Sequence, residues 1–385
     1  MRSICVVTQG FPYKGNSESQ FVGELVNALA RKGVKCYVIA PQSITRRVVR
    51  KKESRPYNWS YKIGDETIDV FQPSYVTLSS TKNRFITSSV FHSFSTAVDR
   101  TFKKHLKGKV EVVYAHFWYS GICAGAIGYK YNLPVFVATG ESSINIKDQI
   151  SLKNRKNALE AIRGVVCVST ANKEASVNLG LTKEGSCVVI PNAVNTDLFC
   201  KMDKKAIRKE LKFPENDFIV TFVGAFIYRK GVRRLSQAID QLVNVKSIFI
   251  GKGNEAPDCS GMLFSGQLPH DEIPRYINAA DVFVLPTLAE GCCNAIIEAL
   301  ACGIPVISSD RPFNEDILSD EYSIKVDPND INQIRDAIES LQNNPDRIRK
   351  MSQKAYEYGH KMNIDNRATL ILQFIDEKVE EAKQT

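Results

Sequence analysis

Two glutamates, Glu290 and Glu298, flank the point where an apolar strand gives way to a helix. Residues 282–285 read as the strand, and the helix that follows stops at Gly303. One carboxylate therefore lies just before a helix, and the other about one turn inside it. The first backbone N–H groups of a helix have no intrahelical partner and attract anions. A phosphate there would have an acid on either side to accept hydrogen bonds from sugar hydroxyls, a layout that suits a nucleotide sugar.

The turn between the two acids supplies the predicted phosphate contacts. They are the backbone N–H groups of Gly291, Cys292, Cys293 and Asn294, with the helix beginning near Cys292 or Cys293. This strand, turn and helix resembles the E-x(7)-E signature of retaining glycosyltransferases of family four, which have the GT-B fold. The resemblance implies that Glu290 is catalytic and faces the transferred sugar, and that Glu298 binds the ribose hydroxyls. An ordinary strand-turn-helix with two exposed acids is the alternative.

A basic pair, Arg229 and Lys230, stands in the segment 224–231, which follows a strand and opens a helix. The segment resembles the family's G-x-x-x-x-x-K-G sequence, in which the basic pair holds the donor diphosphate. A departing diphosphate needs cations, and an arginine fork beside a lysine point charge provides them. A solvated basic turn is the alternative, because Arg233 and Arg234 follow closely.

Two glycine-containing loops also follow strands. Residues 10–18 resemble the family's Gly-rich first loop, usually G-G-x-E, with Asn16 in place of the second glycine. Gly15 would let the backbone approach the donor phosphates, and a plain strand-helix turn is the equal alternative. Residues 251–255 contain Gly253, which the family places near the nucleotide.

Two further acid–base groups stand at strand ends in the first half of the chain. His116, within residues 114–118, resembles the H-A-H-F segment of polysaccharide-building family members, and a structural histidine is the alternative. Residues 137–142 depart from the family, because most members have His-Gly where this chain has Thr139 and Gly140 or Gly140 and Glu141. We expect Glu141 to replace the missing histidine as a polar contact to donor or acceptor.

The composition excludes several other classes of protein. The 385 residues suffice for two domains, and 43% apolar with 24% charged residues is typical of a soluble globular protein. No run reaches the ~18 apolar residues of a membrane span, and the first residues read as a strand and not as a signal peptide. The ten cysteines contain no C-x-x-C pair and indicate reduced thiols in a cytoplasmic protein. No His and Cys cluster predicts zinc.

Positive charge is concentrated in the first half of the chain. Residues 1–190 hold 27 Lys and Arg against 13 Asp and Glu, whereas the remainder holds 24 against 29. This surplus suits an anionic partner, such as an acidic glycan or an anionic membrane that carries a lipid-linked acceptor. The basic run 46–52, followed by Tyr57, Trp59 and Tyr61, predicts peripheral binding to the inner face of the plasma membrane. A mobile, soluble loop is the alternative, and nucleic acid is not expected because no binding motif accompanies the charge.

Apolar runs alternate with helix-length segments, which is the pattern of a parallel, doubly wound sheet. Strands are expected at 3–8, 35–40, 110–115, 135–139, 164–169, 187–190, 218–224, 246–250, 281–285, 305–308 and 323–326. The fold class is therefore α/β, and the resemblance implies GT-B, with two Rossmann-like domains facing a cleft. Residues 43–105 fit the alternation worst and are expected to be loops with one helix near 84–105.

The likeness to the family also divides the chain. Residues 191–195, Pro-Asn-Ala-Val-Asn, resemble the family's PNGVD linker. We expect an acceptor-binding domain at 1–190 and a nucleotide-sugar-binding domain at 191–365. The last helix, at about 366–385, is expected to cross back onto the first domain, as it does in the family.

Together with these patterns, the resemblance implies a hexosyl-type retaining glycosyltransferase that acts in bacterial surface polysaccharide or glycolipid synthesis. A nucleotide-diphosphate sugar would be the donor and a glycan or lipid-linked glycan the acceptor. No D-x-D sequence is evident, so no catalytic metal and no cofactor are expected. A sugar-nucleotide epimerase of the same fold and a catalytically silent nucleotide-sugar-binding partner of another transferase remain open. A nicotinamide dehydrogenase is not expected, because no G-x-G-x-x-G follows the first strand.

Overall fold

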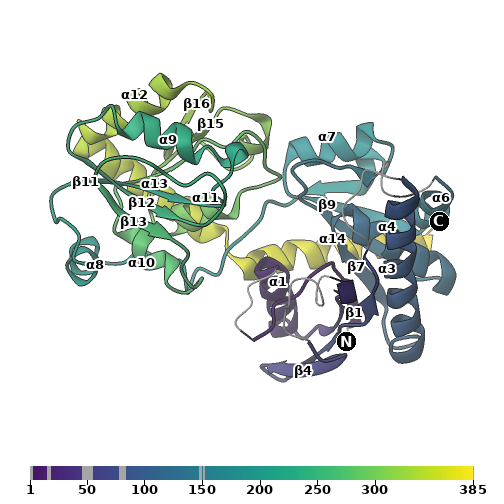
Figure 1. The fold of residues 1–385 in the computed structure, drawn as a ribbon. Coiled ribbons are helices and arrows are strands. Elements are labelled where there is room, and N and C mark those ends of the chain that lie inside the picture. Colours follow the sequence, from purple (N-terminus) through teal and green to yellow (C-terminus); the bar gives the residue numbers. More distant parts are fainter. Residues whose placement is uncertain are drawn as a thin grey trace. The chain divides into compact units, whose positions relative to one another are not determined.

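The computed structural model describes residues 3–14, 19–45, 55–77, 84–146, 150 and 152–384. The chain forms two compact units (Figure 1). The first consists of Met1–Val168, Asn172–Ile190 and Ala368–Thr385, and the second of Ser169–Ala171 and Pro191–Arg367. The boundary expected after residue 190 coincides with a boundary between these units, and the chain returns to the first unit close to the residue expected from the sequence.

The first unit is built on an eight-stranded sheet of order β10-β9-β8-β7-β1-β2-β5-β4. Its strands are β1 Ser3–Val7, β2 Lys35–Ile39, β4 Asn58–Ile63, β5 Glu66–Phe71, β7 Val112–His116, β8 Val135–Thr139, β9 Ile162–Cys167 and β10 Cys187–Val189. All neighbours pair in parallel except β4, which is antiparallel to β5. A separate parallel pair joins β3 (Gln42–Ser43) to β6 (Ser74–Tyr75). The central strands β7 and β8 are buried throughout and mainly apolar because both of their faces are covered.

Helices cover the sheet of the first unit. They are α1 Gln20–Arg31, α3 Arg84–His105, α4 Phe117–Tyr131, α6 Leu152–Ala161, α7 Thr170–Asn178 and the last part of α14 Ile364–Gln384, with the short 3-10 turn η1 at Glu184–Ser186. The ring of Phe374 on α14 lies 6.0 Å from that of Phe136 on β8. A Cβ atom at Gly164 would lie 2.7 Å from the Phe374 ring, so the absence of a side chain at this position on β9 lets the ring pack against the sheet. The last helix thus packs on the first unit.

The second unit is a six-stranded parallel sheet of order β13-β12-β11-β14-β15-β16. Its strands are β11 Phe218–Val223, β12 Val245–Ile250, β13 Met262–Gly266, β14 Val282–Leu285, β15 Val306–Ser309 and β16 Ser323–Val326. Its helices are α8 Lys204–Leu211, α9 Val232–Ile239, α10 Ile273–Asn278, α11 Asn294–Ala301, α12 Ile331–Gln342 and α13 Pro345–Lys361, with 3-10 turns η2 Tyr228–Lys230 and η3 Pro312–Asn314. The strand order reverses direction between β11 and β14, and open α/β sheets bind ligands at this switch point, beyond the carboxyl ends of the strands.

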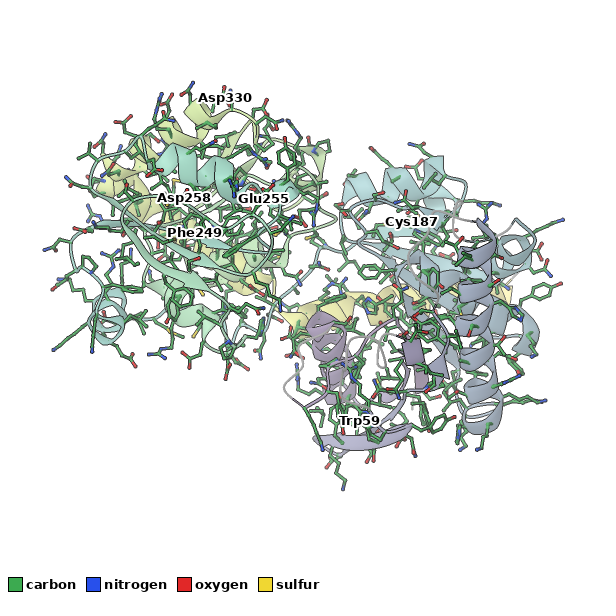
Figure 2. The ribbon with its side chains drawn as sticks, in the orientation of Figure 1. Trp59, Cys187, Phe249, Glu255, Asp258 and Asp330 are labelled. Carbon is green, nitrogen blue, oxygen red and sulfur yellow. The ribbon has the colours of Figure 1, made fainter. Side chains whose placement is uncertain are left out.

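The segment 43–105 differs from the expectation of loops and one helix. The helix is present as α3, but residues 58–71 form the β4–β5 hairpin around Gly64. Side chains of β4 are alternately exposed and half-buried, as in an edge strand with one packed face, and Trp59 lies on this strand (Figure 2). The prediction of loops is wrong here, because the period of two in residues 58–63 determines the structure and their basic and aromatic composition does not.

Candidate functional site

Two loops meet beyond the carboxyl ends of β11 and β14, at the switch point of the second unit. Leu288 of one loop donates its backbone N–H to the carbonyl of Arg229 in the other, at 2.8 Å. Gly231, which begins α9, has a φ of 78°, and a Cβ atom there would lie 2.4 Å from the carbonyl oxygen of Pro286. Only glycine combines this left-handed backbone with so close an approach. The final glycine of the G-x-x-x-x-x-K-G segment therefore allows the two loops to approach each other this closely.

The side chains of Arg229, Lys230 and Glu290 converge between these loops. Glu290 Oε1 lies 2.6 Å from Lys230 Nζ and 2.9 Å from Arg229 Nη1. It also accepts a 2.8 Å hydrogen bond from the Thr287 hydroxyl. Only 13% of the Lys230 side chain and 12% of Glu290 are exposed, against 37% of Arg229. A half-buried carboxylate with two cations leaves one positive charge for an anionic ligand.

The Lys230 ammonium keeps its charge in this setting. Burial alone opposes that charge, but the neighbouring Cys293 sulfur and Glu290 carboxylate outweigh it and raise the pKa of Lys230 above its ordinary value. Burial also raises the pKa of the Cys293 thiol, and that of Cys292 to about 12. Both thiols are therefore neutral near pH 7, and Lys230 and Arg229 carry the positive charge of the site.

The amino end of α11 forms the next wall of the site. The helix begins at Asn294, with Cys293 as an extended N-cap residue whose side chain makes no capping hydrogen bond. The sequence prediction of a start near Cys292 or Cys293 is confirmed. Asn192 Nδ2 donates to the carbonyl of Cys292 at 3.1 Å and to Asn294 Oδ1 at 2.8 Å. Asn192 fixes this turn and was not predicted as a site residue, although it stands in the linker motif that the sequence displays.

Glu298 lies inside α11 and is buried. Its Oε1 atom is 3.5 Å from Nε2 of His270, which follows β13. The His270 ring packs edge-on against the buried Phe199 ring, with 5.2 Å between centroids. His270 is a second neighbour of the site that sequence reasoning missed, because nothing in its local pattern indicates contact with a helix 28 residues further on.

Of the two glycine-containing loops predicted to contact the donor, the structure describes the one with Gly253. Gly253 forms a bridge with Phe226, and a Cβ atom there would lie 2.0 Å from the Phe226 carbonyl oxygen. A glycine is therefore required by the close approach of two loops at this edge of the sheet, and its contact with a nucleotide stays a prediction. Gly15 and the basic run 46–52 lie outside the described residues.

Glu141 lies in the first unit, just past the end of β8. Its carboxylate accepts hydrogen bonds from the backbone N–H of Trp118 at 2.5 Å, the hydroxyl of Thr139 at 2.7 Å and the backbone N–H of Gly140 at 3.0 Å. Trp118 is in the first turn of α4, so the carboxylate occupies the anion site at that helix start. Glu141 thus positions a strand end against a helix, and its predicted contact with a substrate stays a prediction.

His116 ends β7, the strand that pairs with β8, and is 3% exposed. Its ring packs edge-on against Phe21 and Tyr114, with centroid distances of 5.6 and 5.5 Å. The next residue, Phe117, has a φ of 67°, a strained conformation for a bulky side chain. The sharp turn from β7 into α4 thus places His116 and Glu141 on neighbouring strand ends of the same unit.

Over the described ranges, no group of three or more His, Cys, Asp or Glu side chains is placed to hold a metal ion. Among the helices of the described residues, none is both long and apolar enough to cross a membrane.

Known families account for nearly all of this chain. Residues 203–358 match the family described as glycosyl transferases group 1, and residues 19–198 match glycosyltransferase family 4. The chain belongs to the group 1 glycosyltransferases of family four. The two matches meet near residue 200, close to the boundary between the units.

Similar proteins agree with this assignment. The glycosyltransferase is 27% identical over 308 residues to TuaC, a Bacillus subtilis glycosyltransferase assigned to teichuronic acid biosynthesis, with 78% of this chain and 76% of TuaC covered. Sucrose-phosphate synthase from Thermosynechococcus elongatus superposes with a TM-score of 0.79 at 20% identity, over 99% of this chain and 100% of that one. HepE from Anabaena, solved with UDP-glucose, gives 0.69 at 15% identity, over 98% and 100%. The glycosyltransferase therefore has the GT-B fold that the sequence predicts.

Proposed function

We propose that this glycosyltransferase moves a hexosyl-type sugar from a nucleotide-diphosphate sugar to an acceptor hydroxyl, with retention at the anomeric carbon. The pathway proposed is bacterial surface polysaccharide or glycolipid synthesis. The observation that carries the proposal is the cluster of Arg229, Lys230 and Glu290 beside the amino end of α11. Sequence likeness to TuaC and the fold shared with HepE, which binds UDP-glucose, support it.

The donor would lie across the switch point of the second unit. Its diphosphate would contact Arg229, Lys230 and the first N–H groups of α11, including that of Asn294, because these groups concentrate positive charge. Glu298, held near His270, would accept hydrogen bonds from the ribose hydroxyls. Glu290 would accept them from the transferred sugar, and Gly253 would allow close approach of the backbone.

The transfer would follow a same-face route. The bond between the anomeric carbon and the phosphate oxygen breaks, and a bond to the acceptor oxygen forms on the same face. The acceptor proton passes to the departing phosphate oxygen. Arg229 and Lys230 would balance the negative charge that develops on the diphosphate, so the proposal includes no catalytic metal and no cofactor. Both cations and Thr287 engage Glu290 Oε1, which makes this carboxylate a weak nucleophile and supports a route without a glycosyl-enzyme intermediate.

The acceptor would bind the first unit, where His116 and Glu141 lie on neighbouring strand ends. Its surplus of 27 basic over 13 acidic residues supports an anionic glycan or a lipid-linked glycan as acceptor. We infer a cytoplasmic location with peripheral binding at the inner face of the plasma membrane. Salt-sensitive sedimentation with anionic vesicles, weaker for a variant with the five cations of residues 46–52 replaced by glutamine, tests this location. Equal sedimentation with neutral and anionic vesicles at low salt contradicts it.

Thermal-shift measurements with UDP, GDP, ADP and their sugars test the donor site. A ligand at 100 times its dissociation constant stabilises the folded state by about 2.7 kcal/mol. One nucleotide is expected to produce such a shift, and Arg229→Ala and Glu298→Ala are expected to reduce it. Arg233→Ala, an equal loss of charge on the exposed face of α9, is the matched control. Unchanged affinity in both site variants would overturn the donor assignment.

Product analysis separates the alternatives. Incubation with the donor alone would release or isomerise the sugar if the protein were an epimerase of this fold. A silent partner would bind the nucleotide sugar without turnover over any acceptor. Proton NMR of the newly formed glycosidic linkage reports retention or inversion directly.

A further inference from the structure

Two hollows lie on either side of α3 in the first unit. One, of about 550 Å³, is lined by α3 and by residues that border β4 and β6. The other, of about 300 Å³, is lined by α3, α4 and α6. His92 lines both, so the two hollows adjoin along one helix. α3 and α4 lie side by side in the first unit (Figure 1).

The larger hollow is lined mainly by hydroxyl groups. Its polar lining includes Tyr57, Ser89, Ser93, Thr96, Arg100 and Thr101. Ser89, Ser93, Thr96 and Arg100 recur at intervals of three and four residues and therefore share one face of the helix. The opposite face carries Phe94, Val98 and Phe102, which are fully buried in the core. Rows of hydroxyls match ligands that are themselves rich in hydroxyls, because each group both donates and accepts.

Two nitrogen-bearing side chains face solvent at these hollows. Arg100 and His92 are exposed, and neither has an ion-pair or hydrogen-bond partner within the part of the chain that the structure describes. The adjacent Asp99 forms an ion pair with Lys130 at 2.7 Å and accepts a hydrogen bond from the Tyr131 hydroxyl at 3.1 Å. The Arg100 guanidinium thus remains available for a carboxylate, which it can bind through two parallel hydrogen bonds.

Each hollow also has one strongly exposed tyrosine. Tyr57 of the larger hollow is 43% exposed and Tyr129 of the smaller one 53%. Pyranose rings have an apolar C–H face that stacks on aromatic rings, whereas their hydroxyls need polar partners at the edge. Aromatic rings at both hollows, with hydroxyls and a cation in the larger one, fit an extended chain of sugars better than a single small anion.

We propose that the two adjoining hollows beside α3 together bind several residues of an acidic oligosaccharide. Arg100 binds a carboxylate, Ser93 and Thr96 bind sugar hydroxyls, and Tyr57 and Tyr129 stack on sugar rings. The ligand's role as acceptor or product chain rests on the proposed function, but its binding does not. The site would hold the glycan on the enzyme between successive encounters with donor.

Isothermal titration of the full chain with hexagalacturonate, and with maltohexaose as the neutral counterpart of equal length, tests the site. Hexagalacturonate is expected to bind and maltohexaose to bind at least tenfold more weakly. Arg100→Gln is expected to weaken hexagalacturonate binding about tenfold, since a charge-assisted contact contributes about that factor. Tyr129→Ser, on the other side of α3, is expected to weaken it as well. Lys103→Gln, an exposed cation on α3 outside both hollows, is the control and is expected to leave it unchanged.

Absence of hexagalacturonate binding, or an equal loss for Arg100→Gln and Lys103→Gln, overturns the site. Equal affinity for maltohexaose overturns the assignment of an acidic ligand. Glu298→Ala, in the other unit, is expected to lose nucleotide affinity and to bind hexagalacturonate as the wild type does. Failure of the glycan site and failure of the donor site are thus measured separately.

Discussion

At the scale of single residues, the Glu290 carboxylate determines how much positive charge the proposed donor site offers. It sits between Arg229 and Lys230 and cancels one of their two charges. A diphosphate that arrives beside them competes with Glu290 for the same cations. We expect the Thr287 hydroxyl, which also bonds Glu290 Oε1, to keep this carboxylate in place while the cations are shared with the diphosphate.

Lys230→Ala is expected to weaken nucleoside diphosphate binding by about 1.5–3 kcal/mol, the range for hydrogen bonds to charged groups. The pKa of Lys230 is raised above its ordinary value of 10.5, so its ammonium stays charged as pH rises from 7 to 9. Wild-type affinity should therefore not fall over this interval through loss of the Lys230 charge. Titration calorimetry at three pH values measures both effects. An affinity in Lys230→Ala equal to the wild type would remove this residue from the site.

Glu141→Gln is expected to lower turnover and stability while leaving nucleotide affinity near normal. A glutamine has one acceptor oxygen, and its amide hydrogens would face the donors of Trp118 or Thr139. Loss of such a helix-capping acceptor costs about 1–2 kcal/mol. Single-turnover assays and thermal unfolding separate the two effects. Full turnover in a Glu141→Ala variant that is destabilised would leave Glu141 with a positioning role alone and make His116 the better catalytic candidate.

Cys187 is expected to be the first thiol to react with iodoacetamide. A hydrogen bond from the buried Cys167 thiol, with smaller contributions from Thr182 and Lys173, lowers the pKa of Cys187 to about 7. Cys187 is half-buried on β10 (Figure 2), whereas burial raises the pKa of the Cys5, Cys36 and Cys123 thiols. The alkylation rate should rise with pH and reach half its maximum near pH 7, because the thiolate is the nucleophile. Peptide mass spectrometry after brief labelling identifies the site, and preferential labelling of another cysteine would contradict it.

At the scale of elements, the sequence predicts the buried parallel strands best. Strands such as β7, β8 and β14 are buried throughout and mainly apolar because helices cover both faces, so their position is visible in composition alone. β13 has only half-buried and exposed side chains and escaped prediction, as did the β4–β5 hairpin. Edge strands carry less of this signal because one side of the ladder and part of one face meet water.

The same contrast applies to the candidate site. Arg229, Lys230 and Glu290 were predictable because each stands in a local motif at a strand end. Asn192 and His270 approach α11 from segments 100 and 28 residues away. Such contacts depend on tertiary packing, which leaves no periodic mark in a single sequence.

Gly231→Ala is expected to destabilise the second unit and to weaken nucleotide binding, because η2 carries both basic residues and ends at this glycine. Gly180→Ala is the matched control, since Gly180 has a similar φ of 65° but no atom within 4 Å of an added Cβ. The control is expected to cost about 1 kcal/mol, the penalty for a left-handed backbone, and Gly231→Ala more than that. Thermal unfolding with and without nucleotide measures both. Equal losses would show that the contact with Pro286 carries no energy.

At the scale of the whole molecule, the alternation of strands and helices predicts two doubly wound units. The resemblance of residues 191–195 to the family linker predicts the point where the chain leaves the first unit. The prediction that the last helix returns to the first unit came from the family resemblance, because the sequence of α14 does not indicate the sheet on which it packs. That docking depends on a pair of residues far apart in the sequence, Phe374 and Gly164.

Phe374→Ala is expected to destabilise the first unit by about 3–5 kcal/mol, the usual cost of removing a buried phenylalanine. Leu370→Ala, on the same helix but 50% exposed, is the control and is expected to change stability little. Both tryptophans of the chain, Trp59 and Trp118, belong to the first unit, so tryptophan fluorescence during urea unfolding reports on this unit. Similar midpoints for the two variants would contradict the docking of α14 through Phe374.

The two segments through which the chain passes into and out of the second unit lie next to each other. Val194 donates its backbone N–H to Met362 and accepts from Ile364, both at 3.0 Å, and Arg367 Nε donates to the carbonyl of Pro191 at 2.8 Å. Both ends of the chain belong to the first unit. Residues 191–367 therefore have the connectivity of an inserted domain whose two ends are joined by hydrogen bonds. We expect such a segment to be exchangeable between homologous proteins without a change in the path of the remaining chain. A family built this way could inherit the sugar it uses and the polymer it extends from different ancestors.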